Sequence, residues 1–175
     1  MLPMRLLRGC ALAGLWMTGA LAQTAQQQNR NEPMLTIAGW VETVTFPDYG
    51  IVLDAKLDTG ADSSSLGVSG LERFKRDGKT WYRFALTGED GKTATIEQQT
   101  NRIARIMRAE VEDTRRPIVR LKICLAGHVA EVDFSLTDRS DQRSRVLIGR
   151  RFLASRILVD SSRKHVFPKH CEGAK

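Results

Sequence analysis

The amino-acid sequence predicts an all-β domain with one or two short helices at most. From Met34 onward, apolar residues form short runs or alternate with polar residues, which is the period of β-strands. Turn residues separate these runs, and two pairs of runs flank a short segment that contains Gly, as in β-hairpins. The length of 175 residues suits one domain and excludes two large ones.

The N-terminus predicts an export signal. Arg5 and Arg8 precede a short apolar run that ends in Ala20-Leu21-Ala22, which is the layout of a signal peptide cleaved after residue 22. An uncleaved membrane anchor is the alternative. Polar and glycine residues interrupt the run, however, and it is shorter than the roughly 20 apolar residues of a spanning helix.

Residues 23–33 are rich in Gln and Asn and have no apolar period, so we expect a flexible leader. The folded domain is expected over residues 34–170, without a stable membrane span once residues 1–22 are removed. These features predict a periplasmic or secreted protein.

The charge balance does not indicate a nucleic-acid partner. The formal net charge is +7, and the loss of the two arginines in the signal peptide leaves the mature chain basic. Lys and Arg are spread along the sequence instead of forming one stripe. We therefore interpret them as solvated faces or as a means of attraction to anionic envelope material.

Export also affects the cysteines. Cys10 lies in the signal peptide, so Cys124 and Cys171 remain in an oxidising compartment. The sequence leaves two alternatives open, a disulfide between them or a free buried Cys124 with a loose Cys171.

The expected elements follow the apolar pattern along the chain. The strands are Leu35–Val44, Ile51–Leu57, a run through Tyr82, Phe84 and Leu86, Thr93–Gln99, a run through Val119 and Leu125, a run through Val132 and Leu136, and Val146–Ile148. Residues 103–110 fit either a helix or a strand. Arg150–Arg156 fits a short helix, and Ile157–Asp160 begins a last hairpin around Ser161 and Ser162.

One short segment carries candidate chemistry. Asp58 follows the strand Ile51–Leu57 and precedes Thr59, Gly60 and Ala61, so a carboxylate stands at a strand end on a loop of small residues. Such a loop lets a substrate backbone approach closely, and the Gly60 N–H can donate to the carboxylate. Asp, Thr and Gly are also ordinary turn residues, so this triplet alone is weak evidence.

Two motifs in this order make a resemblance specific. The segment from Leu57 to Ser64, LDTGADSS, resembles the active-site loop of retropepsins, and Val146–Arg150, VLIGR, resembles their second signature. From Gly39 to Phe167 the chain resembles the bacterial retropepsin-like aspartic peptidases, whose older label is putative ATP-dependent zinc protease. The matching segments are KLDTGA at residues 56–61, RPIV at 116–119, LTDRS at 136–140 and LIGR at 147–150. The resemblance implies a closed, barrel-like acid-protease domain.

The resemblance also implies roles for individual residues. Asp58 would be the catalytic acid and base, and the Thr59 hydroxyl would lock two facing loops together. Ala61 would support the loop, while Gly60 and Asp62 would contact the substrate backbone.

The second signature would hold that loop in place. Gly149 and Arg150 would be its structural partners, and the planar guanidinium of Arg150 would pair with Asp62. The hairpin tip Gly88–Gly91 is a candidate for a flap over the peptide.

The mechanism of this family needs two carboxylates that share one proton, and the chain contains one Asp-Thr-Gly. We therefore expect a homodimer in which each subunit contributes Asp58, with a polypeptide as substrate and an acid-leaning activity profile.

The older label's zinc and ATP are not expected as cofactors. No His-Glu-x-x-His is present, and His128, His165 and His170 lack the spacing of a metal-binding helix. Gly91-Lys92-Thr93 resembles the end of a phosphate-binding loop, but Leu86 stands where the first Gly is required.

The sequence leaves competing functions. The first is a metal-independent aspartic endopeptidase. The second is an envelope protein that holds an extended peptide in the same cleft without cutting it. The third, a zinc enzyme, would lose activity with chelators.

Overall fold

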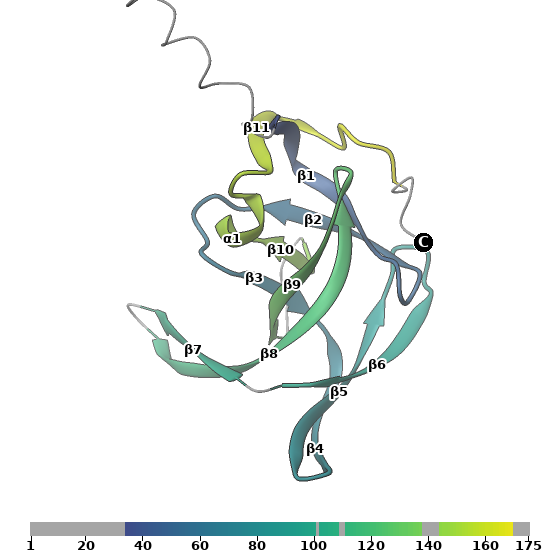
Figure 1. Ribbon diagram of the computed structural model, residues 1–175, viewed down its shortest axis with the longest axis vertical. Coiled ribbons are helices and arrows are strands. Elements are labelled where there is room, and N and C mark those ends of the chain that lie inside the picture. The colour runs from purple at the N-terminus through teal and green to yellow at the C-terminus, as the bar shows by residue number, and fades with distance from the viewer. Residues whose placement is uncertain (1–33, 101, 109–110, 138–143, 170–175) are drawn as a thin grey trace, which may run out of the picture. The chain divides into compact units, whose positions relative to one another are not determined.

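The computed structural model describes residues 34–100, 102–108, 111–137 and 144–169 (Figure 1). The predicted signal peptide and leader lie outside these residues and stay predictions. Within the described residues, no helix is long and apolar enough to cross a membrane.

Strands dominate the described chain. They are β1 (Thr36–Phe46), β2 (Ile51–Leu57), β3 (Ser64–Gly67), β4 (Ser69–Arg76), β5 (Lys79–Thr87), β6 (Thr93–Gln99), β7 (Arg102–Arg108), β8 (Val111–Leu125), β9 (His128–Thr137), β10 (Val146–Ile148) and β11 (Ile157–Lys164). The helix α1 spans Arg150–Leu153. The prediction of an all-β domain with a short helix is confirmed.

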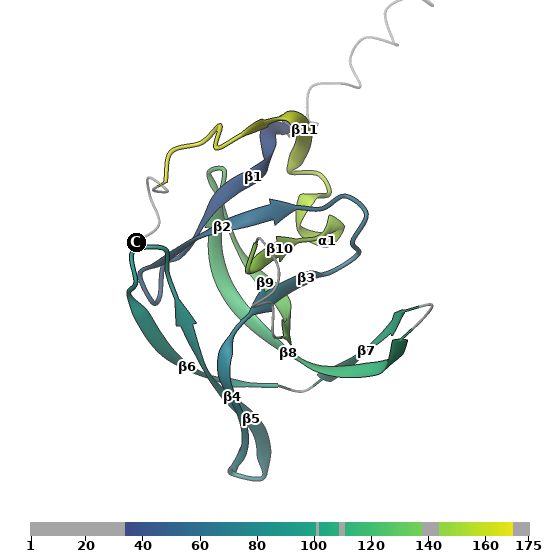
Figure 2. The ribbon, with the colours of Figure 1, turned by 180° about the vertical axis from the view of Figure 1, so that it is seen from behind.

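Six strands close a barrel in the order β1, β2, β10, β3, β9 and β8. Backbone pairing of Val44 with Leu125 and of Thr45 with Cys124 joins β8 back to β1 and closes the circle. The strands β11 and β7 extend the same sheet at its two ends, as Figures 1 and 2 show.

The barrel interior is filled by alternating side chains. In β2, every second residue from Ile51 to Leu57 is buried, because successive side chains of a strand point to opposite faces. The rings of Phe46 and Phe134 lie inside with centroids 6.0 Å apart, and both side chains are fully buried. Lys56 and Asp58 belong to the other, outward face of this strand.

The short strand β10 determines where the loop after β2 lies. It pairs in parallel with β2, Leu147 opposite Lys56 and Ile148 opposite Leu57, and antiparallel with β3. Since β2 and β10 run in the same direction, their C-terminal ends meet at one edge of the barrel. Asp58 and Gly149 follow these two ends directly.

A separate three-stranded sheet, β4–β5–β6, follows β3 in the sequence and precedes β7, β8 and β9. Together with β7 to β9 it makes up most of the 90 residues that separate Asp58 from Gly149 in the sequence. One face of the sheet packs Phe84, Leu86 and Ile96 into the core.

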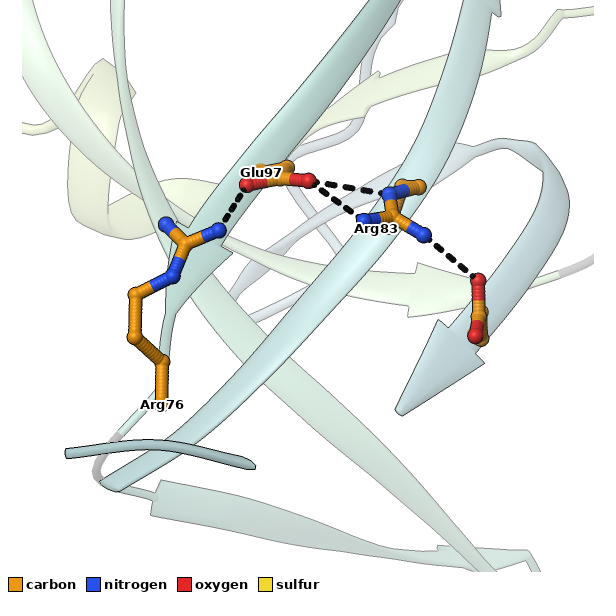
Figure 3. Close-up of polar contacts among 4 residues, drawn as sticks. Arg76, Arg83 and Glu97 are labelled. Atoms are coloured by element: carbon orange, nitrogen blue, oxygen red, sulfur yellow. Dashed lines mark hydrogen bonds and ion pairs between the residues drawn. The ribbon is translucent and has the colours of Figure 1, made fainter. Parts of the chain in front are cut away.

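The opposite face of this sheet carries an aromatic pair covered by arginines. The Arg76 guanidinium lies 4.7 Å from the Trp81 ring centroid, and the Arg83 guanidinium lies 5.1 Å from that of Phe74. Glu97 binds both arginines, as Figure 3 shows. Because each arginine has both a ring and a carboxylate partner, we interpret this network as a cover for the aromatic pair.

Three expectations for single elements are settled or corrected. Of residues 103–110, which fitted either a helix or a strand, residues 103–108 lie in β7, paired with β8, and residues 109 and 110 lie outside the described residues. The predicted helix at 150–156 ends at Leu153. The predicted hairpin around Ser161 and Ser162 is wrong, because this segment lies within the single strand β11, which pairs in parallel with β1.

A bulge explains the turn-like sequence within β11. The register shifts between Gly39 and Val41, which pair with Asp160 and Lys164, so residues 161–163 bulge out of the pairing. The Asp160 carboxylate accepts hydrogen bonds from the N–H and hydroxyl of Ser162. Gly39 is required there, since a Cβ atom would lie 2.5 Å from the Arg163 carbonyl oxygen.

Cys124 is buried in β8 and forms a disulfide. Both other cysteines of the chain lie outside the described residues. The alternative of a free buried Cys124 is therefore excluded.

A buried carboxylate anchors the C-terminal segment to β1. The side chain of Glu42 is fully buried and accepts hydrogen bonds from the N–H groups of Gly39 at 2.7 Å, Val166 at 3.0 Å and Phe167 at 3.2 Å. These three donors compensate the cost of burying a carboxylate.

We predict that Glu42→Gln lowers the free energy of unfolding by about 2 to 3 kcal/mol, because the amide has one acceptor oxygen and its NH₂ group faces backbone donors. Urea denaturation of the protein measures this. The matched control is Glu131→Gln, on the exposed position of β9, which we expect to change stability by less than about 0.5 kcal/mol. Equal effects of the two substitutions would contradict the anchoring role.

Candidate active site

Asp58 is held at the C-terminal edge of β2. Its N–H donates to the carbonyl oxygen of Ile148 at 2.9 Å, which continues the β2–β10 pairing past the end of both strands. The carboxylate is about one quarter exposed, with a relative accessibility of 26%. Asp58 therefore sits on a fixed backbone and faces outward.

The loop after Asp58 folds back onto the carboxylate. Asp58 Oδ1 accepts hydrogen bonds from the N–H groups of Gly60 at 3.0 Å and Ala61 at 3.3 Å. The bond from Gly60 is the one expected from the sequence. A Cβ atom at Gly60 would lie 3.2 Å from the same oxygen, so the absence of a side chain leaves room for it.

The second carboxylate oxygen has a charged neighbour that sequence reasoning missed. Lys56 Nζ lies 3.2 Å from Asp58 Oδ2. Burial raises the pKa of the Asp58 carboxyl, but the hydrogen bonds from Lys56, Gly60 and Ala61 and the charge of Lys56 outweigh it. The pKa of Asp58 is consequently below its ordinary value.

The first residues of α1 also hold the Asp58 loop in place. The N–H of Arg150 donates to the Ala61 carbonyl at 2.8 Å, and that of Arg151 to the Asp62 carbonyl at 3.2 Å. The first N–H groups of a helix have no partner within the helix. Here the loop carbonyls accept these hydrogen bonds, so helix start and loop satisfy each other.

The two arginines have different roles from those expected. The guanidinium of Arg150 donates to the carbonyl oxygens of Thr59 at 3.2 Å and Gly60 at 3.1 Å. The expected pairing of Arg150 with Asp62 is wrong, because Arg151 makes that ion pair at 2.7 Å. Arg151 pairs with Asp62 in place of Arg150 because the Arg150 side chain extends to the loop tip at Thr59 and Gly60.

Gly149 lies where the chain passes closest to the loop. A Cβ atom there would lie 2.6 Å from the carbonyl carbon and oxygen of Ser63, so no other residue fits without movement of the backbone. Its N–H donates to the buried hydroxyl of Ser64 at 3.1 Å. Gly149 and Arg150 thus both contact the loop.

The residues expected to meet a substrate are accessible. Thr59, Gly60 and Asp62 are exposed, while Asp58 and Ala61 are half-buried. The structure brings all of them together within one loop. Their roles in substrate binding and in locking two loops stay predictions.

The hairpin tip Gly88–Gly91 is not placed as a flap. The N–H of Glu89 donates to the carbonyl of Val52 at 3.1 Å, and the Glu89 carboxylate accepts the N–H of Asp54 at 3.0 Å. Val52 precedes Asp58 by six residues of strand, or about 20 Å. The tip is therefore bonded to the far end of β2.

The histidines within the described part have other partners. His128 Nε2 lies 3.0 Å from the Thr36 hydroxyl, and His165 Nε2 lies 3.5 Å from Asp54 Oδ2. Among the residues that the structure describes, no three His, Cys, Asp or Glu side chains are grouped so that they could hold a metal ion. His170 lies outside these residues.

Comparison with known proteins decides the family. A family model described as "Retropepsin-like aspartic endopeptidase RimB" matches residues 37–170. The chain belongs to the RimB-like family. The resemblance seen in the sequence is thereby confirmed, and with it the retropepsin-like all-β fold.

Curated relatives of this RimB-like chain carry a different name. A "Probable alpha-L-glutamate ligase" of Shewanella halifaxensis is 32% identical over 130 residues, which are 72% of this chain and 28% of the relative. A protein of the same name from Parasynechococcus marenigrum is 25% identical and likewise covered to 28%. The chain thus spans little more than a quarter of these relatives.

A solved structure with a similar fold is that of the protein Lpg0085 of unknown function from Legionella pneumophila. It is 29% identical, has a TM-score of 0.64, and the match covers 75% of this chain and 97% of that chain.

Lys56 and Arg151 are the residues that sequence reasoning missed. The signal for Lys56 was its position two residues before Asp58, which puts both side chains on one face of the strand. Arg151 gave no such signal, because which of two adjacent arginines reaches Asp62 depends on how α1 packs.

We predict that Arg150→Met speeds hydrogen exchange at the amides of Gly60 and Ala61 by roughly fivefold to tenfold, since the guanidinium bonds to the loop tip are lost. Amide exchange followed by NMR measures it. The neighbouring Arg151→Met is the matched control and should change these rates less, because its ion pair with Asp62 is exposed. A larger effect of Arg151→Met would contradict the assignment.

Proposed function

We propose that this chain is an aspartic endopeptidase that hydrolyses peptide bonds as a homodimer, with one Asp58 from each subunit. The observation that carries the proposal is the geometry of the Asp58 loop. It presents a carboxylate with one oxygen held by two backbone N–H groups at an exposed, glycine-containing edge. The family match supports the same reaction class.

The proposed reaction needs one ionised and one protonated carboxylate. The ionised Asp58 takes a proton from water as the water oxygen bonds to the peptide carbonyl carbon, and the protonated Asp58 gives its proton to the carbonyl oxygen. When the resulting diol collapses, one diol hydroxyl gives its proton to the ionised carboxylate and becomes the carbonyl of the new carboxyl group, the C–N bond breaks, and the amine nitrogen takes a proton from the protonated carboxyl group. The pair is then singly protonated again, as it was at the start.

A second copy of the chain is part of this proposal because one chain contains one Asp-Thr-Gly. Closed two-fold symmetry would place the same loop of each subunit opposite its mate. Thr59 is exposed next to Asp58 and can then bond across the interface, since a hydroxyl both donates and accepts. Gly60 and Asp62 would contact the backbone of the bound peptide.

The names of the curated relatives do not supply the reaction. They are called glutamate ligases, but the match covers 28% of their length, so ligation is not assigned to these residues. The competing proposal is a protein that binds an extended peptide without cleaving it. The strands β7 and β11 lie at the two edges of the sheet. An extended peptide can pair with such an edge as an additional strand, which favours the binding function.

We predict that Asp58→Asn lowers the rate of peptide cleavage by roughly a thousandfold or more while the dimer is retained, because the amide cannot accept the proton of the attacking water. Cleavage of a peptide library by the protein and sedimentation of each variant measure the two properties. The matched control is Asp54→Asn, on the same face of β2 and nearer its start, which should keep full activity.

Inhibitor sensitivity separates the reaction classes. We expect an aspartic-peptidase inhibitor with a hydroxyl at the scissile position to stop cleavage and a metal chelator to leave it unchanged. Cleavage that survives Asp58→Asn, or that a chelator stops, would contradict the proposal. A wild-type dimer that binds peptides but does not cut them would favour the binding function.

A further inference from the structure

Lys56 contacts the Asp58 carboxylate on the oxygen that the loop leaves free. The backbone N–H groups of Gly60 and Ala61 bond to Oδ1, and the Lys56 ammonium lies 3.2 Å from Oδ2. The acid of the proposed enzyme therefore has a cation directly beside it, supplied by the strand that precedes the loop. The family match and the sequence motif assign no role to this residue.

The strand itself fixes this contact. Lys56 and Asp58 are two residues apart at the end of β2, so their side chains project from the same face. In the neighbouring strands the residues opposite Lys56 are Val41 of β1 and Leu147 of β10, both half-buried and apolar. The lysine stem is thus flanked by apolar side chains, and the ammonium reaches the carboxylate.

The other cations near the loop are directed elsewhere. The Arg150 guanidinium donates to the carbonyls of Thr59 and Gly60, and Arg151 pairs with Asp62. Among the described residues, Lys56 is the side chain whose charge bears on Asp58, both by hydrogen bond and by electrostatic attraction.

We propose that Lys56 is a positioning residue that sets the charge of the paired Asp58 carboxylates and the pH window in which the site works. This inference rests on the proposed function. Two facing carboxylates repel each other, so one of them normally keeps its proton well above its ordinary range. One Lys56 from each subunit opposes that repulsion.

The direction of the effect follows from charge. An adjacent cation favours the ionised form in both ionisation steps of the carboxylate pair, so both steps occur at lower pH. The singly protonated pair that the reaction needs is then populated in a more acidic window than it would be without the lysine. Removal of Lys56 should move that window towards neutral pH.

The test compares Lys56→Met, which keeps the stem and removes the charge, with Lys56→Arg, which restores a cation. The control is Lys75→Met in β4, whose ammonium bonds to the Thr80 hydroxyl. The titration of Asp58 is followed by NMR of its carboxyl carbon in the protein, and cleavage of one peptide is measured across pH for each variant.

We expect Lys56→Met to raise the midpoint of the Asp58 titration by about one pH unit, near the lower end of the effect of an opposite charge at this distance. Both limbs of the cleavage profile should shift in the same direction. Lys56→Arg should return both towards the wild type, and Lys75→Met should change neither. A merely structural role would alter the unfolding free energy or the maximal rate without moving the limbs.

An unchanged Asp58 titration in Lys56→Met, or an equal shift in Lys75→Met, would overturn the inference. The titration does not depend on catalysis, so it decides the role of Lys56 even if wild-type protein cuts no peptide. In that case the proposed function fails by itself. Lys56 is half exposed, with a relative accessibility of 45%, so the substitution should leave the fold intact, and the amide spectrum of each variant checks this.

Discussion

The attachment of one loop to the start of one helix organises the candidate site. Asp58 continues the pairing of β2 with β10, and the first N–H groups of α1 bond to the carbonyls of Ala61 and Asp62. Each segment supplies the hydrogen-bond partners that the other lacks. A Cβ atom at position 149 would collide with the backbone of Ser63. The loop and the helix start can therefore approach this closely only because residue 149 is glycine.

The closed barrel is what brings these two segments together. They are 90 residues apart in the sequence, and most of the intervening chain forms the inserted sheet β4–β5–β6 and the strands β7 to β9. Since β2 and β10 are parallel neighbours, their C-terminal ends lie side by side whatever the path of the inserted strands. An insertion of this size can therefore change the outer surface while the Asp58 loop stays in place.

The sequence predicted the parts of the fold that depend on local pattern. Alternating apolar residues gave β2 and the β5–β6 and β8–β9 hairpins, and the two motifs gave the Asp58 loop and Gly149. It missed β3, because Ser64–Gly67 is short and becomes a strand through long-range pairing with β9. It also missed β4, because Ser69–Arg76 is polar, although it forms a local hairpin with β5 around Asp77 and Gly78. The sequence also could not show that Asp160 and Ser162 form a bulge, since the parallel partner of β11 is β1.

Within the site, backbone contacts were more predictable than side-chain contacts. The Gly60 N–H bond to the carboxylate follows from a turn of three residues, whereas the choice between Arg150 and Arg151 for Asp62 depends on the orientation of α1. The hairpin tip Gly88–Gly91 lies away from Asp58 because the Glu89 carboxylate accepts the N–H of Asp54 in β2. No local sequence pattern predicts this contact.

We propose that one working site is formed by two chains. Calorimetry measures this as the stoichiometry of a tight-binding peptide inhibitor with a hydroxyl at the scissile position, titrated into the protein. We expect one inhibitor bound for every two chains, and no binding under conditions that keep the protein monomeric. One inhibitor for each chain, with the affinity unchanged in the monomer, would contradict it.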